Sequence, residues 1–155
     1  MLRLTELVRS GAVTAVDGVL TLPFADRRRS RLRTRLDDGR EAALLLPHGT
    51  VLRDGDRLRA EGGGAVISVR AADETLSWAT TSDPLLLARA AYHLGNRHVP
   101  VQLGEGSVAY QHDHVLDGMV REIGLHLHLR QAPFEPEAGG YRHAGHSHGG
   151  HSHEH

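Results

Sequence analysis

The chain has 155 residues, of which 39% are hydrophobic and 24% charged, an ordinary composition for a folded protein of one or two small domains. It contains no cysteine, and all 18 basic residues are arginine, which excludes thiolate catalysis, disulfides, zinc-cysteine sites and lysine chemistry. The formal net charge of −1 indicates neither a nucleic acid nor an anionic membrane as a partner. No apolar run approaches the roughly 18 residues of a membrane span, and charged residues interrupt the opening segment, so we expect a cytoplasmic protein.

Residues 1–72 have the pattern of a small all-β domain. Apolar and polar residues alternate at 20–24 and 31–36, and short apolar runs follow at 42–46 and 65–69. Glycine-containing turn signals separate these stretches. A domain of about 70 residues without disulfides buries little apolar surface of its own, so we expect it to pack against the rest of the chain for stability.

Residues 73–132 are predicted to form strands and helices in the order β-α-β-β-α-β, which is typical of a ferredoxin-like domain. The predicted strands are 75–80, 99–103, 107–110 and 125–130, and the predicted helices are 83–95 and 113–124. Asp83 before Pro84 is a typical helix start, and Gly95 is expected to end that helix in a left-handed conformation. Pro100 places its strand at a sheet edge, because proline cannot donate to a ladder. The fold class is therefore expected to be α+β.

Residues 133–155 show no periodicity and are expected to be a flexible, histidine-rich tail. Six of the 13 histidines fall there, at His143, His146, His148, His151, His153 and His155. Neutral imidazole is a common ligand of nickel, copper and zinc alike, so the tail is a candidate metal-binding segment. Glycine, serine and glutamate between the histidines favour a native tail over an engineered tag, which is normally an unbroken run.

Three further histidines are candidate metal ligands. His98 is expected at the surface, in a turn between a helix and an edge strand, where a two-fold axis would pair it with its copy in a second chain. Without such an axis it is an ordinary solvated residue. His112 and His114 flank Asp113, which leaves two alternatives: a pair of ligands on one side of an extended backbone, or two exposed histidines beside a helix cap.

The other sequence motifs do not predict a metal site, a nucleotide site or a catalytic site. His126 and His128 share a strand face that is expected to be exposed to solvent. Residues 104–109 spell GxGxxA, but they lie in a predicted hairpin and lead into no helix, so they are interpreted as a turn. Six arginines within 27–35 favour a protein partner over nucleic acid, because no aromatic residue is interleaved for stacking. No catalytic set is found, so no enzyme is expected.

Several segments together resemble the UreE family of urease accessory proteins. They are 83–85, 92–102 with the string GlyAsnArgHisValPro, 110–119 with HisAspHis, and 133–141 followed by the histidine-rich tail. The match is dense from residue 83 onward and looser over the all-β part, where the turn 54–56 and the arginine-bearing strand contribute.

The resemblance implies a homodimeric nickel chaperone with a peptide-binding-like domain at 1–72 and a ferredoxin-like metal-binding domain at 73–132. It implies that His98 is the nickel ligand at the dimer interface and that His112 and His114 form a secondary site for copper or zinc. The implied activity is delivery of Ni(II) to apo-urease, in complex with the urease accessory GTPase. The rival hypotheses are a histidine-rich storage or detoxification protein for divalent metals and a metallohydrolase, for which a general base is not found.

Overall fold

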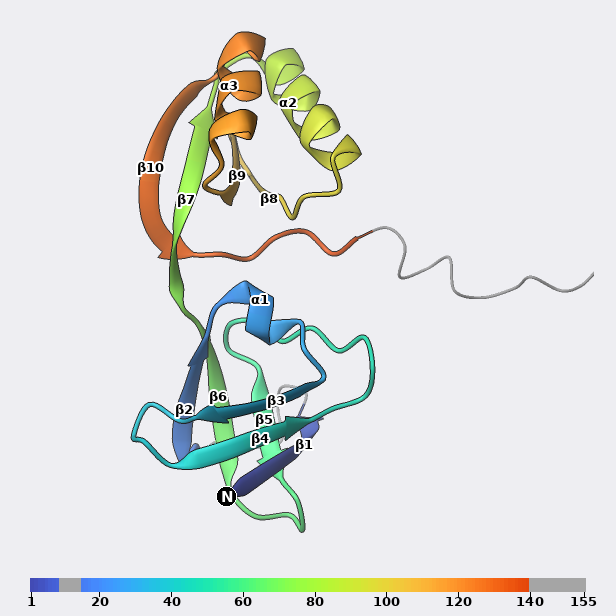
Figure 1. Ribbon diagram of the computed structural model, residues 1–155, viewed down its shortest axis with the longest axis vertical. Helices are drawn as coiled ribbons and strands as arrows, with labels where there is room; N and C mark the ends of the chain where they lie inside the picture. Colours follow the sequence, from blue (N-terminus) through green and yellow to red (C-terminus); the bar gives the residue numbers. More distant parts are fainter. Residues whose placement is uncertain (9–14, 140–155) are drawn as a thin grey trace, which may run out of the picture.

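The structure is a computed structural model that describes residues 1–8 and 15–139. They form two domains stacked end to end, with β6 of the first leading directly into β7 of the second (Figure 1). The elements of the first domain are β1 (Leu2–Val8), β2 (Gly18–Leu22), α1 (Phe24–Arg27), β3 (Arg31–Arg35), β4 (Glu41–Leu45), β5 (Arg57–Ala60) and β6 (Val66–Ala71). The elements of the second are β7 (Asp73–Thr80), α2 (Pro84–Asn96), β8 (Gln102–Gly104), β9 (Ser107–Gln111), α3 (His114–Ile123) and β10 (His126–Pro133).

The described part of the first domain contains a six-stranded sheet in the order β2-β6-β5-β1-β4-β3. Its β1–β4 and β2–β6 pairs are parallel, and the other pairs are antiparallel. Leucines dominate the core on the inner face of this sheet, among them Leu4, Leu20 and Leu58, all without solvent exposure. The predicted strand 20–24 is wrong at its end. The strand stops at Leu22, because Pro23 has no N–H for a ladder, and Pro23 precedes the short helix α1 at its N-cap position.

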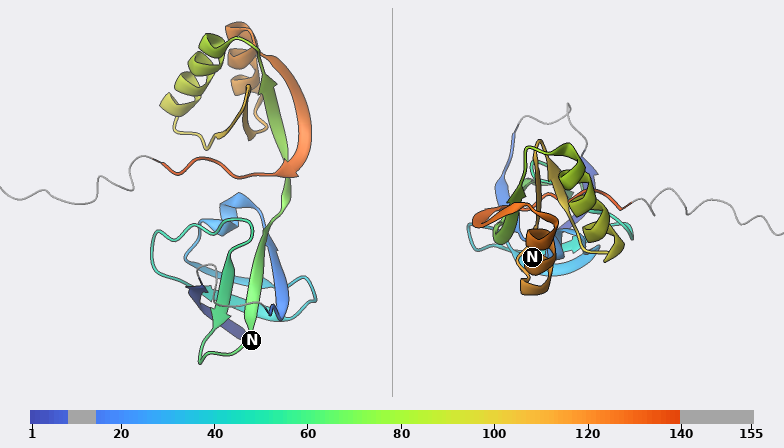
Figure 2. Two further views of the ribbon diagram at one scale, coloured as in Figure 1. Left: turned by 180° about the vertical axis from the view of Figure 1, so that it is seen from behind. Right: turned by 90° about the horizontal axis from the view of Figure 1, so that it is seen from above.

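The second domain has the predicted element order, with a four-stranded antiparallel sheet in the order β10-β7-β9-β8. Helices α2 and α3 lie together on one face of this sheet (Figure 2). Strand β8 is at the sheet edge, as expected from Pro100, although it begins only at Gln102. No helix in the described parts of the chain has the length and apolar character needed to cross a membrane.

The helix starts follow the sequence signals, but one helix end does not. Asp83 caps α2 by accepting the N–H of Leu85 at 2.9 Å, and Gly124 ends α3 in the left-handed conformation with φ 116°. The prediction that Gly95 ends α2 in this conformation is wrong. The helix continues to Asn96, and tight backbone bonds from the following residues delay the left-handed turn until His98, at φ 58°.

The chain after β10 passes between the two domains (Figure 1). We call residues 134–139 the crossing segment. Phe134 in it is fully buried and meets Phe24 of α1 edge to face, with ring centroids 5.7 Å apart. The expectation of a flexible tail from residue 133 is therefore wrong for 133–139, because this stretch packs against both domains. The remainder of the predicted tail, residues 140–155, lies outside the described residues.

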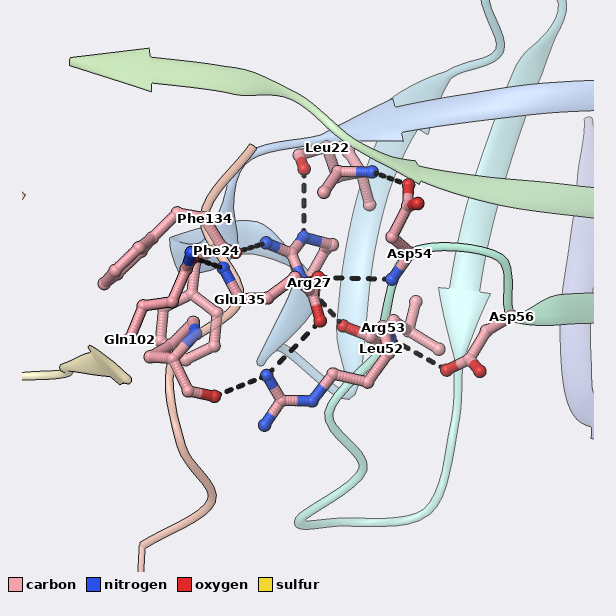
Figure 3. A network of polar contacts seen from close by, with 12 residues as sticks. Leu22, Phe24, Arg27, Leu52, Arg53, Asp54, Asp56, Gln102, Phe134 and Glu135 are labelled. Atoms are coloured by element: carbon pink, nitrogen blue, oxygen red, sulfur yellow. Dashed lines mark hydrogen bonds and ion pairs between the residues drawn. The ribbon is translucent and has the colours of Figure 1, made fainter. Parts of the chain in front are cut away.

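Arg27 fastens the crossing segment to the first domain (Figure 3). Its side chain has no solvent exposure and donates to Glu135 Oε1 at 2.5 Å and to the backbone oxygens of Leu22, Leu52 and Phe134. Arg53 adds a bond to the carbonyl oxygen of Pro136 at 2.7 Å. On the other side, the N–H of Glu135 donates to Gln102 Oε1 of β8 at 2.8 Å. The crossing segment therefore joins the two domains.

Candidate metal site

His98 has a backbone conformation that residues other than glycine rarely adopt. In the described part of the chain it alone among non-glycine residues has a positive φ, 58°, and its N–H donates to Gly95 O at 3.0 Å. The left-handed conformation costs an L-residue about 1 kcal/mol, although histidine and asparagine tolerate it better than most. The residue is exposed, so packing does not demand an imidazole there. A strained backbone at an exposed histidine makes His98 a candidate functional residue.

His98 lines a pocket of about 690 Å³ between the two domains. Phe24 and Arg28 contribute to its wall from the first domain, and His98 and Pro100 contribute from the second. The third part of the wall is residues 137–139 of the crossing segment. The pocket therefore brings together the turn after α2, part of the first domain and the crossing segment.

The histidines of the tail follow this pocket directly in the sequence. Gly139 is in the pocket wall, and His143 comes four residues later. Four residues span at most about 14 Å, so His143 is tethered within that distance of Gly139. The six candidate ligands of the tail themselves lie outside the described residues: His143, His146, His148, His151, His153 and His155.

His112 and His114 lie side by side where β9 leads into α3. Their ring centroids are 5.2 Å apart, and the ring planes are inclined by 70°. Asp113 between them caps α3, because its side chain accepts the N–H groups of Val115 and Leu116. Features of both alternatives from the sequence are thus present, the paired rings and the helix cap. The two imidazoles are close enough together to be offered to one metal ion.

A buried carboxylate behind His112 was missed by the sequence analysis. Asp117 is 2% exposed, and its Oδ2 lies 3.1 Å from His112 Nδ1. Its Oδ1 accepts the phenol O–H of Tyr110 at 2.6 Å. Burial, followed by this hydrogen bond, raises the pKa of Tyr110, so the phenol keeps its proton. The available signal was a charged residue beside Leu116 in the apolar stripe of the predicted helix.

The remaining sequence motifs stay outside this arrangement. His126 and His128 stand exposed on β10, as expected. The GxGxxA stretch is a hairpin turn with Gly106 at φ 66°. The arginine-rich stretch is not one surface, because Arg27 is buried at the domain joint while the arginines of β3 are exposed.

The described residues contain no closed metal cage. Over residues 1–8 and 15–139, no group of three or more histidine, cysteine, aspartate or glutamate side chains is placed so that it could hold a metal ion. Any ion held at His98, or at the His112–His114 pair, would take its further ligands from water, from the tail or from a second chain. Such sites suit exchangeable metal better than a permanent structural ion.

The fold and these histidines define a two-domain α+β protein whose imidazoles are presented at exposed positions. The model "UreE urease accessory protein, N-terminal domain" matches residues 4–72, and "UreE urease accessory protein, C-terminal domain" matches residues 65–155. The chain belongs to the UreE family of urease accessory proteins. This confirms the resemblance found in the sequence. The family consists of accessory proteins and not of enzymes, in agreement with the sequence analysis.

Individual relatives match over almost their whole length. A urease accessory protein UreE of Pseudomonas putida (strain GB-1) is 52% identical over 144 residues, which cover 93% of this chain and 87% of the relative. A protein of the same name from Alkalilimnicola ehrlichii is 54% identical, with 91% and 85% covered. One from Escherichia coli O157:H7 is 51% identical, with 91% and 90% covered.

Proposed function

We propose that this protein is a cytoplasmic nickel metallochaperone that delivers Ni(II) to apo-urease during assembly of the urease metallocentre. Relatives about half identical over nearly the whole chain are named urease accessory proteins, which supports the urease part of the proposal. The nickel part rests on His98, an exposed imidazole held in a strained conformation in the wall of the pocket that leads to the histidine-rich tail.

In this proposal the protein works as a homodimer, with the two copies of His98 facing one nickel ion. Five large apolar side chains are exposed in the described part of the same domain, among them Tyr92 in α2, which is 65% exposed, and Leu103 in β8, which is 50% exposed. Leu103 also lines the His98 pocket, which makes this region a suitable surface for a second copy. Two shared imidazoles hold an ion loosely, and a tail histidine adds a third ligand that is easily withdrawn.

The two domains are assigned different roles in this proposal. We assign residues 73–132 as a ferredoxin-like metal-binding domain, supported by the element order and by the strand order β10-β7-β9-β8. Residues 1–72 are assigned as a peptide-binding-like domain that serves contacts with apo-urease and the urease accessory GTPase. The histidines from His143 to His155 add metal capacity, and the His112–His114 pair forms a secondary site for copper or zinc.

The decisive experiment is transfer of nickel to apo-urease in a purified mixture with the accessory GTPase. The wild-type protein loaded with Ni(II) should restore urease activity, and His98→Ala should abolish this restoration. His48→Ala is the matched control, because His48 is also an exposed histidine in a turn but lies in the first domain. Equal transfer by the His98→Ala variant and the wild type would overturn the role of His98.

A storage or detoxification protein for divalent metals is the second candidate, favoured by the number of histidines in the tail. A chain ending at Gly140 separates the two functions. A chaperone without its tail should bind fewer nickel ions in equilibrium dialysis and still activate urease in excess nickel. A protein that takes up many ions and transfers none to apo-urease would be a store.

A further inference from the structure

We propose that Asp117 is a positioning residue that holds His112 in the tautomer with a proton on Nδ1 and a free lone pair on Nε2. Nε2 is then the nitrogen that His112 presents to a metal ion. The inference rests on the proposed function, in which His112 and His114 form a secondary metal site. It is carried by the contacts around one buried carboxylate.

The elements bring three polar side chains together behind His112: Tyr110, Ser77 and Asp117. Tyr110 is in β9, and His112 follows directly after the end of this strand, where its N–H donates to Thr75 O of β7 at 3.1 Å. Ser77 of β7 lies directly opposite Tyr110 in the strand register. Asp117 reaches these side chains from the first turn of α3, where the helix dipole favours a negative charge.

The hydrogen-bond requirements of the carboxylate select the tautomer. An ionised carboxylate only accepts hydrogen bonds, and Asp117 Oδ1 accepts one from the Tyr110 O–H at 2.6 Å. Oδ2 lies 3.1 Å from His112 Nδ1, in a close contact that favours a proton on this nitrogen. An unprotonated Nδ1 would direct its lone pair toward the negative charge of the carboxylate. We therefore infer that Nδ1 carries the proton.

Ser77 is the competing partner of the same nitrogen, because its Oγ is also 3.1 Å from His112 Nδ1. A hydroxyl can donate or accept, and it can rotate toward the Tyr110 oxygen instead, whereas the carboxylate has no such choice. A hydrogen bond to a charged acceptor is also about twice as strong as one between neutral groups. The carboxylate and not the hydroxyl therefore decides the tautomer.

The expected consequence is tighter binding of metal at this pair. A carboxylate behind a histidine fixes the ring orientation and raises the basicity of the ligating nitrogen, and its loss typically lowers metal affinity about 10–100-fold. The His112 side chain is 30% exposed, so part of it reaches solvent.

The direct test reads the tautomer in the full-length, metal-free protein by long-range ¹H–¹⁵N correlation at about pH 8. The His112 signals are assigned by their loss in His112→Ala. Wild type should show the Nδ1–H tautomer. Asp117→Asn should convert it to Nε2–H, because the amide of the new residue donates to Nδ1. A wild-type ring with its proton on Nε2, or the same tautomer in both proteins, would overturn the inference.

Two further variants keep the test decisive if Asp117→Asn folds poorly. Ser77→Ala removes the competing hydroxyl and should leave the Nδ1–H tautomer unchanged, and a switch in that variant would assign the effect to the serine. Glu122→Gln is the matched charge control, since Glu122 is an exposed carboxylate on the same helix. It should change neither the tautomer nor metal binding.

A copper(II) titration of the full chain separates this inference from the proposed function. Paramagnetic loss of the amide signals of 111–116 reports this pair independently of the tail. Asp117→Asn should raise the copper concentration needed for half loss about 10–100-fold. If wild type and His112→Ala/His114→Ala lose these signals at the same concentration, the proposed secondary site is absent. The tautomer measurement still decides the role of Asp117.

Discussion

At position 98 the backbone conformation and the proposed role of the side chain favour different residue types. The left-handed conformation at φ 58° favours glycine, whereas the proposed nickel ligand requires an imidazole. Histidine is one of the few residues that meet both demands at a modest cost in free energy. The strained backbone therefore lies at the proposed nickel ligand. Its cost can be measured as a difference in the free energy of unfolding between variants.

Replacement of His98 should separate strain from ligation. His98→Gly should be more stable than His98→Ala by about 1 kcal/mol in urea unfolding, because alanine keeps the penalty of the left-handed backbone and glycine does not. Both variants should fail to activate urease. Equal stability of the two would mean that the turn after α2 has changed its conformation.

The tyrosine behind the histidine pair predicts a pH dependence of stability. The pKa of Tyr110 in the fold is raised above the ordinary value near 10, so its contribution is fully present below about pH 10. Above that pH the unfolded chain gains stability by ionising this tyrosine and the folded chain does not. The free energy of unfolding should therefore fall more steeply between pH 10 and 11.5 in wild type than in Tyr110→Phe.

The control for this titration is Tyr92→Phe, because Tyr92 is exposed on α2. It should leave the slope of stability against pH as in wild type. Near pH 7, Tyr110→Phe should cost roughly 1–3 kcal/mol, since it deprives the buried Asp117 carboxylate of a donor. A Tyr110→Phe variant with the wild-type alkaline slope would contradict the role given to burial.

At the scale of single elements, the helix caps carry local stability that the sequence already indicates. Asp113 accepts two N–H groups at the start of α3, at 2.8 and 3.0 Å. Asp113→Ala should therefore lower the free energy of unfolding by about 1 kcal/mol, whereas Asp113→Asn should cost less because its side-chain oxygen still caps. Urea unfolding measures both changes. An alanine variant as stable as wild type would mean that water replaces the cap.

The helices and strands could be predicted where a signal in the local sequence determines their ends or their order. The caps at Asp83 and Asp113, the end of α3 near Gly124 and the β-α-β-β-α-β order all follow from short-range chemistry. The end of β2 at Leu22 was misplaced because the alternation of apolar residues continues past Pro23. The burial of Phe134 could not be predicted, because its partner Phe24 lies far away in the sequence.

The candidate metal ligands of the site could be predicted from the sequence. The residues that contact these ligands could not. Histidines are visible in the sequence because they are numerous and clustered, so His98, His112 and His114 could be named. Asp117 could not be selected, because its contact with His112 depends on how α3 packs against the sheet. The pocket beside His98 needs the crossing segment between two domains, which no local pattern indicates.

At the scale of the whole molecule, one buried guanidinium ties the crossing segment to the first domain. Arg27 has no exposure, and its carboxylate partner Glu135 is 32% exposed in the crossing segment. Arg27→Met should lower the free energy of unfolding by about 3–5 kcal/mol, since it breaks a buried pair and strands three carbonyl oxygens. Calorimetry should show one unfolding transition for wild type and two for Arg27→Met.

The matched control is Arg33→Met, because Arg33 is an exposed arginine of β3 in the same domain. It should change stability by no more than about 0.5 kcal/mol. A double-mutant cycle of Arg27→Met with Glu135→Gln should give a coupling energy, because the two residues share one contact. Additive effects would locate the stability of the joint in the carbonyl contacts alone.

The domain joint also has a consequence for the order in which the protein forms on the ribosome. Arg27 and Glu135 are separated by 108 positions, and translation delivers the N-terminal part first. The guanidinium of α1 is therefore synthesised long before its carboxylate partner, and the whole second domain must emerge in between. The leucine core of the first domain can form during translation, but the Arg27 side chain has no carboxylate partner until Glu135 emerges. The crossing segment, which is translated after both domains, then supplies the contacts that join them.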